Sequence, residues 1–173
     1  MRVKERRAGR RSLSHVDSEG AARMVDVSAK PITVREAVAR GRIRIAAAAM
    51  RLVRSGGLRK GGVVEVARLA GILAAKRTAD AIPLCHPLPL THVDVDLRPR
   101  RDGFDIVARV ATEARTGAEM EALHAVAVAA LTVYDMVKAA DKGMTISDVQ
   151  LVRKSGGAGG TYARPRATRR ARG

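Results

Sequence analysis

The chain has 173 residues, of which 46% are hydrophobic but only 2% aromatic, and it carries a formal net charge of +16. This length predicts one domain with a core of its own, and the single cysteine, Cys85, excludes an internal disulfide framework. No apolar run approaches the ~20 residues of a membrane span, and residues 1–12 lack the apolar stretch of a signal peptide. We therefore expect a cytoplasmic protein without a membrane partner.

Most of the excess positive charge lies at the two ends of the chain. Residues 1–12 and 161–173 each carry a net charge of +5, which leaves +6 for the residues between them. Segments this rich in Arg, Gly and Ala cannot bury a core. We therefore predict disordered basic tails at 1–12 and 158–173, which bind polyanions loosely, around a single domain at 13–157.

In the first part of the domain, the residue pattern indicates several short elements. Thr33 and Glu36 have the spacing of a capping box, which predicts that a helix begins there, and Gly41 would end it. The expected elements are a strand at 24–27, a helix at 33–39, a strand at 42–45, a helix at 46–53 and a longer helix at 63–78.

The second part of the domain has longer patterns. Pro83, Pro87 and Pro89 exclude a regular helix from their segment. Residues 90–112 alternate between apolar and polar side chains, which is typical of an antiparallel hairpin with one buried face. A long apolar helix at 116–140, a strand at 144–153 and a glycine-rich loop at 155–160 follow. Together these elements predict an α+β fold with helices packed on one face of an antiparallel sheet.

Lysine is rare in this chain, with seven residues against 26 arginines. A lysine ammonium is a compact, titratable charge, whereas a guanidinium stays protonated in proteins. Because the chain uses arginine where it needs only positive charge, its remaining lysines indicate a site that handles anions and protons, with chance as the alternative. Six of them fall within the predicted domain: Lys30, Lys60, Lys76, Lys138, Lys142 and Lys154.

Asp135 and Lys138 lie three residues apart on the predicted long helix, so their side chains share one face and can touch. Such a pair offers an acid and a base whose titrations are coupled. An ordinary salt bridge near the end of a helix explains the same spacing. The two residues alone leave both interpretations open.

Several other residues have chemistry that suits a site. Cys85 and His86 are neighbours in the proline-rich segment, but one cysteine without a second paired motif predicts no metal site, so His86 is better explained as a substrate- or anion-binding group. Glu121 either stabilises the helix dipole or faces a ligand. Lys60 and Lys154 precede glycines, whose amides can approach phosphate oxygens, although an ordinary loop fits as well.

Six segments of the chain carry a resemblance to a known family. They are residues 24–30 (MVDVSAK), 71–78 (GILAAKRT), 82–88 (IPLCHPL), 116–123 (TGAEMEAL), 133–138 (VYDMVK) and 154–157 (KSGG). In this order they closely resemble the cyclic pyranopterin monophosphate synthase family of molybdenum cofactor biosynthesis. The set is far more specific than any one of its members.

This resemblance implies a lyase that converts (8S)-3′,8-cyclo-7,8-dihydroguanosine 5′-triphosphate to cyclic pyranopterin monophosphate and pyrophosphate. It also implies a ferredoxin-like fold that assembles as a homohexamer, a trimer of dimers, with active sites at subunit interfaces. Such an enzyme requires no cofactor, although a divalent cation could accompany the triphosphate.

The resemblance also assigns roles to single residues. It implies that Asp135, Lys138 and Lys60 are the catalytic acid–base residues. The substrate-binding residues would be Leu84, Cys85, His86, Met120 and Glu121, with Lys30, Arg35, Lys154 and Arg23 as basic groups near the triphosphate.

Two positions depart from the family pattern and leave other functions open. Ala158 stands where the glycine loop of the family has a lysine, and Arg23 stands where a histidine is common and cannot transfer protons at neutral pH. A catalytically inactive scaffold is therefore one alternative. A nucleic-acid-binding module is another, but aromatic side chains for base stacking are nearly absent, so we expect no specific nucleic-acid partner.

Overall fold

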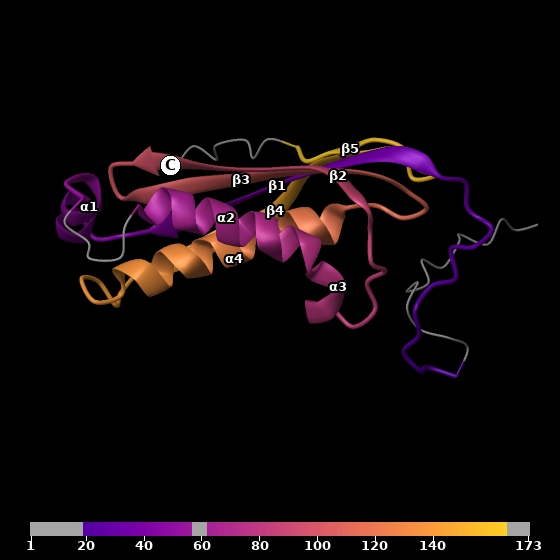
Figure 1. The fold of residues 1–173 in the computed structure, drawn as a ribbon, viewed down its shortest axis with the longest axis horizontal. Coiled ribbons are helices and arrows are strands. Elements are labelled where there is room, and N and C mark those ends of the chain that lie inside the picture. Colours follow the sequence, from indigo (N-terminus) through magenta and orange to yellow (C-terminus); the bar gives the residue numbers. More distant parts are fainter. Residues whose placement is uncertain (1–18, 57–61, 166–173) are drawn as a thin grey trace, which may run out of the picture.

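A five-stranded antiparallel sheet forms one layer of the structure, and the helices lie against one of its faces (Figure 1). The computed structural model describes residues 19–56 and 62–165. The strands are β1 (Thr33–Arg44), β2 (Leu90–Arg100), β3 (Gly103–Ala114), β4 (Thr145–Ser155) and β5 (Tyr162–Ala163), in the sheet order β2-β3-β1-β4-β5. The helices are α1 (Ala47–Arg54), α2 (Val63–Lys76), α3 (Thr78–Ala81) and α4 (Glu119–Val137).

The order of these elements is consistent with a ferredoxin-like domain. Helices follow β1, the β2–β3 hairpin comes next, and α4 leads into β4. β1 is central, because it pairs with β3 on one side and with β4 on the other. The predicted α+β fold, with helices on one face of an antiparallel sheet, is confirmed.

Small aliphatic side chains fill the layer between the sheet and the helices. Ala37, Ala39 and Ile43 of β1 are buried, because alternate residues of a strand point to the same face. α4 contacts β1, β3, β4 and α2, and nine of its side chains are buried. Its length and composition would suit a membrane span, but burial inside the domain accounts for the apolar sequence.

The close contact between α2 and α4 depends on Gly71. A Cβ at this position would lie 3.0 Å from the carbonyl oxygen of Ala125 and 3.3 Å from the Cβ of Ala129. Both residues belong to α4, and a backbone oxygen inside a helix cannot move aside. Glycine therefore lets the two helices approach closely in a core that has few large side chains.

The face of the sheet that the helices leave uncovered carries charged side chains in pairs. Arg109 of β3 lies 3.2 Å from Asp94 of β2, and Arg100 of β2 lies 2.6 Å from Asp105 of β3. All four side chains are partly exposed to solvent. Because the pairs join opposite charges, much of the arginine charge on this face is neutralised locally.

The predicted helix at 33–39 is wrong, because this segment is the first half of the strand β1. The capping-box spacing of Thr33 and Glu36 is a local signal worth about 1 kcal/mol. β1 instead pairs along its whole length with β3 and also with β4, and this pairing outweighs the local preference. The strand predicted at 42–45 is confirmed up to Arg44, as the end of the same long strand.

Two other predictions need correction at the ends of the domain. Residues 24–27, predicted to be a strand, belong to no strand. The segment from 158, which we expected to be a disordered tail, contains β5, whose residues Tyr162 and Ala163 pair with Lys154 and Arg153 of β4. The predicted N-terminal tail at 1–12 lies outside the described residues.

Candidate active site

A pocket of about 350 Å³ lies where β3 ends and α4 begins. Three segments form it: the stretch before β1, the proline-rich loop before β2, and the first turn of α4. Its lining consists of Val25, Val27, Lys30, Leu84, Cys85, His86, Leu88, Thr116, Gly117, Glu119, Met120 and Glu121. The pocket therefore joins parts of the sequence that are up to about a hundred residues apart.

Half of the residues that the sequence implicates in the site meet in this pocket. Lys30 comes from the N-terminal stretch, and Met120 and Glu121 come from α4. The proline-rich loop supplies Leu84, Cys85 and His86. The structure thus brings together all the predicted substrate-binding residues except the basic groups Arg23, Arg35 and Lys154.

Two buried threonines fix the loop that carries Cys85 and His86. Before the loop, the Thr78 hydroxyl donates to backbone carbonyls of α2 and lies 3.2 Å from Nδ1 of His124. After the loop, the Thr112 hydroxyl donates to the carbonyl oxygen of Pro89 at 2.8 Å. Both threonines are 1% exposed, so buried hydrogen bonds anchor the chain to the core before and after the loop.

Glu121 is the buried acid of the pocket, with only 4% of its surface exposed. Burial, with a smaller contribution from the neighbouring Glu119, raises the pKa of Glu121 to about 7. Burial, and then the charge of Glu121, also raises the pKa of the Cys85 thiol. At neutral pH the pocket therefore holds a carboxyl group that can donate or accept a proton beside a thiol that stays protonated.

The N-terminal stretch forms a tight turn beside the pocket. The Asp26 carboxylate accepts a hydrogen bond from the Ser28 amide at 2.8 Å, and the Lys30 amide donates to the carbonyl oxygen of Val27 at 2.9 Å. The bond from Ser28, followed by the charges of Arg23 and His86, lowers the pKa of Asp26. Arg23 is therefore close enough to influence this turn electrostatically, although it does not line the pocket.

Arg35 and Lys154 lie at the same end of the sheet. Arg35 donates through Nε to the carbonyl oxygen of Ala114 and through Nη2 to that of Arg115, both at 3.0 Å. Its guanidinium also occupies the space that a Cβ of Gly157 would need, and Gly157 has a φ of +69°. The glycine loop after β4 is thus packed on Arg35.

The predicted catalytic pair lies at the other end of α4. Nζ of Lys138 is 2.7 Å from Oδ1 of Asp135, and both side chains are more than half exposed. The hydrogen bond with Asp135, and then its charge, raise the pKa of Lys138. Because α4 rises ~1.5 Å per residue, Asp135 is roughly 21 Å from Glu121 along the helix. One chain therefore does not bring the acid–lysine pair to the pocket.

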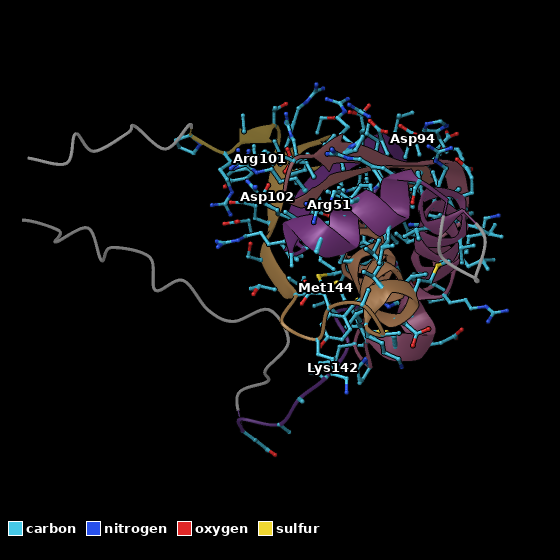
Figure 2. The ribbon with its side chains drawn as sticks, turned by 90° about the vertical axis from the view of Figure 1, so that its left-hand side faces the viewer. Arg51, Asp94, Arg101, Asp102, Lys142 and Met144 are labelled. Carbon is cyan, nitrogen blue, oxygen red and sulfur yellow. The ribbon has the colours of Figure 1, made fainter. Side chains whose placement is uncertain are left out.

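Figure 2 looks at this opposite end of the domain, where Asp102 of the β2–β3 turn and Lys142 and Met144 after α4 are labelled. Lys60, the third predicted catalytic residue, lies outside the described residues.

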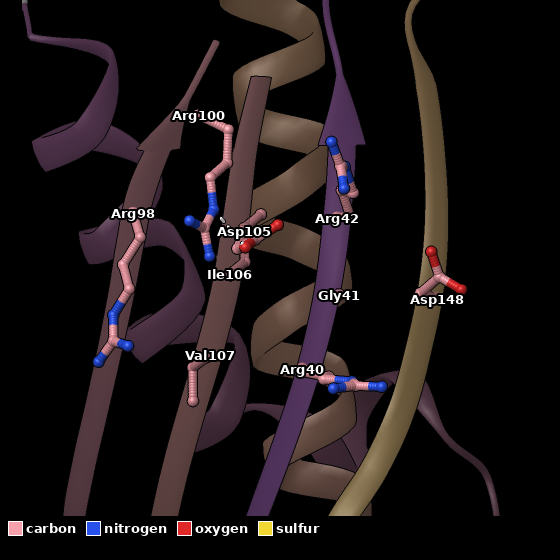
Figure 3. A pocket seen from close by; sticks show the side chains of 9 residues that line it. All are labelled: Arg40, Gly41, Arg42, Arg98, Arg100, Asp105, Ile106, Val107 and Asp148. Atoms are coloured by element: carbon pink, nitrogen blue, oxygen red, sulfur yellow. Dashed lines mark hydrogen bonds and ion pairs between the residues drawn. The ribbon is translucent and has the colours of Figure 1, made fainter. Parts of the chain in front are cut away.

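A larger pocket, of about 440 Å³, lies on the uncovered face of the sheet (Figure 3). Arginines from β1 and β2 surround it, together with Asp105 of β3 and Asp148 of β4. Arg100 is paired with Asp105, and Arg42 is paired with Asp102 at 2.8 Å. This pocket contains none of the residues implicated by the sequence, so the smaller pocket is the candidate site.

The sequence did not indicate several residues that lie in or beside the pocket. Val25 and Val27 alternate with the polar residues of the turn, a pattern that we interpreted as a strand. Arg115, which donates to the carbonyl oxygens of Ser28 and Lys30 beside the pocket, gave no signal because a single arginine after a strand is common. Within residues 19–56 and 62–165, no three His, Cys, Asp or Glu side chains are grouped so that they could hold a metal ion.

The fold and the pocket together define an α+β domain with a site for a small anionic molecule. Its pocket combines a buried acid, an imidazole and a lysine, which are groups suited to proton transfer and to binding a small anionic molecule. Residues 24–157 match the model of the MoaC family, and the chain belongs to this family.

Three relatives resemble this chain over most of their length and its own. The cyclic pyranopterin monophosphate synthase of Thermomicrobium roseum is 60% identical over 154 residues, which cover 88% of this chain and 93% of the relative. The protein of the same name from Heliobacterium modesticaldum is 58% identical over 154 residues, covering 88% of this chain and 97% of the relative. That from Parvibaculum lavamentivorans is 55% identical over 154 residues, covering 88% and 96%.

Proposed function

We propose that this chain is a cyclic pyranopterin monophosphate synthase of molybdenum cofactor biosynthesis. It converts (8S)-3′,8-cyclo-7,8-dihydroguanosine 5′-triphosphate to cyclic pyranopterin monophosphate and releases pyrophosphate. The observation that carries the proposal is the meeting of Lys30, His86 and Glu121 in one pocket of a MoaC-family domain. Ala158 and Arg23, which depart from the family pattern, do not line this pocket.

The pocket suits recognition of the nucleotide part of this substrate. Lys30 presents a positive charge for a phosphate group, with Arg23, Arg35 and Lys154 around the same end of the sheet. His86 and Glu121 orient the ring system by hydrogen bonds. Because the pKa of Glu121 is about 7, this residue can donate to a ring carbonyl or accept from a ring N–H. Leu84, Cys85 and Met120 supply the apolar surroundings.

Asp135, Lys138 and Lys60 form the proposed acid–base set. The reaction opens one ring, closes another and releases pyrophosphate, so protons must move on and off nitrogen and oxygen. With its pKa raised by Asp135, Lys138 carries its proton at neutral pH. It therefore keeps a positive charge that can stabilise the departing pyrophosphate, and the base is a different member of the set.

A second copy of the chain completes the site in this proposal. Asp135 and the pocket are too far apart in one chain to act on the same reacting atoms. The outward faces of the helix layer expose Val66, Leu69 and Leu73 of α2 and Leu131 of α4. Twofold packing of these apolar faces would bring the end of α4 in one copy to the pocket of the other. We propose a homohexamer, a trimer of such dimers.

The remaining surroundings of the enzyme follow from its substrate. We propose that it works in the cytoplasm and needs no cofactor of its own. A divalent cation, if used, arrives with the triphosphate, whose oxygens are its natural ligands. The basic tails bind polyanions without sequence preference.

The direct test is a turnover assay on the purified full chain. We expect incubation with the cyclised guanosine triphosphate intermediate to produce a pterin monophosphate and pyrophosphate in equal amounts. A chain that binds the intermediate but yields neither product would be an inactive scaffold instead, and the proposed function would be wrong.

A further inference from the structure

We propose that Arg115 is a positioning residue that holds Lys30 at the pocket. Arg115 follows the last residue of β3 and does not line the pocket. It acts through the turn that carries Lys30. The inference rests on the proposed function, because its main effect is measured on turnover of the cyclised triphosphate.

The contacts of Arg115 reach the turn from a distant part of the chain. Its Nη1 donates to the carbonyl oxygen of Lys30 at 2.8 Å and also to that of Ser28. The hydrogen bonds within the turn, from Ser28 to Asp26 and from Lys30 to Val27, fix only its local shape. The two bonds from Arg115 cross more than 80 residues of sequence, so they fix where the turn lies relative to α4 and the pocket.

The backbone of Arg115 is itself held firmly. Arg35 donates to the carbonyl oxygens of Ala114 and Arg115, and the guanidinium of Arg35 lies against the backbone at Gly157. These bonds occupy two of the donors of Arg35. The two arginines therefore form a brace that runs from the glycine loop, through the end of β3, to the turn that carries Lys30.

The position of Lys30 needs this support because the Lys30 side chain is exposed. A long flexible side chain on a loose turn would lose conformational entropy when it binds a phosphate. If Arg115 orders the turn in the free protein, less conformational entropy is lost when the substrate binds. The benefit appears as tighter substrate binding, and the chemical step is unaffected.

The test is a double-mutant cycle between Arg115→Gln and Lys30→Gln in the full chain. We expect Arg115→Gln to raise KM for the cyclised triphosphate about tenfold with kcat within about twofold of wild type. Lys30→Gln should have an effect of similar size. The double variant should be no worse than Lys30→Gln alone, because Arg115 acts only through Lys30.

Two further variants separate positioning from other roles. Arg115→Lys keeps a positive donor that can reach a carbonyl oxygen and should restore part of the affinity. Arg109→Gln removes the same charge from β3, but its guanidinium pairs with Asp94 on the uncovered face of the sheet. It should leave KM unchanged.

An unchanged KM in Arg115→Gln would overturn the inference, and so would losses that multiply in the double variant, since these would indicate an independent contact with substrate. If the wild-type chain does not turn over, the proposed function fails and the positioning role is judged by hydrogen exchange. Faster exchange of amides 26–30 in Arg115→Gln, but not in Arg109→Gln, supports the role; equal exchange overturns it.

Discussion

Glu121 is a carboxylic acid held almost out of contact with water in the first turn of α4. An exposed acid in this position would simply stabilise the helix through a favourable interaction with its dipole. Burial instead raises its pKa to about 7, so near neutral pH the group exists in both protonation states. This property distinguishes Glu121 from a residue that only stabilises the helix. The sequence had left two roles open for Glu121, stabilising the helix dipole or facing a ligand, and the burial favours the second.

The titration of Glu121 should make the stability of the chain depend on pH. Its pKa is about 7 in the folded chain against an ordinary value of 4.5. Between these values the folded state keeps a proton that the unfolded state has released, so stability falls as the pH rises from about 4.5 to 7. The loss is on the order of 3 kcal/mol.

Replacing Glu121 by Gln tests this expectation. Glu121→Gln should raise the free energy of unfolding at pH 8 by about 1–3 kcal/mol and change it little at pH 5, since the amide cannot ionise. Urea unfolding at both pH values measures the difference. Glu113→Gln, an exposed residue of β3, is the control. Parallel shifts at the two pH values would contradict the assignment.

Variants of Lys138 and Lys60 test the proposed proton-transfer role. Arginine keeps the positive charge but not the titratable ammonium. We expect Lys138→Arg and Lys60→Arg to lower kcat by about 10²–10³-fold with KM within a few-fold of wild type. For Lys138→Arg, the midpoint of urea unfolding should stay at its wild-type value, because the pair with Asp135 is exposed. Normal turnover in both variants would leave the lysines a purely electrostatic role.

At the scale of the elements, the long patterns and the short helix at 46–53 were predicted well, whereas the helix at 33–39 was not. The β2–β3 hairpin and α4 were recognised because burial of one or most faces imposes a pattern over many residues. The helix expected at 33–39 failed because its capping signal covers only one turn. The sequence placed the pocket residues in a proline-rich loop and at the beginning of a helix. It did not show that these segments lie side by side, because that depends on how distant elements pack.

The contact between α2 and α4 gives a prediction at this scale. Gly71→Ala would normally stabilise a helix by about 1 kcal/mol. Here the new Cβ would lie 3.0 Å from the carbonyl oxygen of Ala125 and 3.2 Å from Val95 Cγ1. We therefore expect a net loss of about 1–2 kcal/mol in the free energy of unfolding.

Gly62→Ala is the matched control in thermal or urea unfolding. Its Cβ would meet only Glu65 Cγ, at 4.0 Å, so no clash arises, and any loss reflects only weaker capping of α2 by alanine. A stabilised Gly71→Ala variant would mean that the helices can move apart freely.

In the whole molecule, the residues predicted to form one site lie in two separate places. The pocket and the Asp135–Lys138 pair lie at the two ends of α4, at opposite ends of the domain (Figure 1). The predicted helix at 116–140 already contained both Glu121 and Asp135, so their separation along the helix followed from the sequence. Whether a second copy brings the two ends together did not follow, because packing between copies leaves no local pattern.

Mixing two inactive variants tests whether copies share a site. His86→Ala damages the pocket and Lys138→Ala damages the other end of α4. If each site takes His86 from one copy and Lys138 from another, half of randomly mixed dimers contain one intact site of two. We then expect about a quarter of wild-type activity after unfolding and refolding the variants together. Sites contained in single chains would give no recovery, and either variant refolded alone is the control.

The charge pairs on the uncovered face of the sheet have a practical consequence for handling the enzyme. Solvent-exposed pairs such as Arg109 with Asp94 contribute little to stability, and the fold is held by an aliphatic core whose burial concentrated sulfate or phosphate strengthens. Dissolved ions do weaken the attraction between basic tails and nucleic acid. A wash in concentrated sulfate or phosphate should therefore strip contaminating RNA and DNA from freshly purified material while the catalyst itself remains folded.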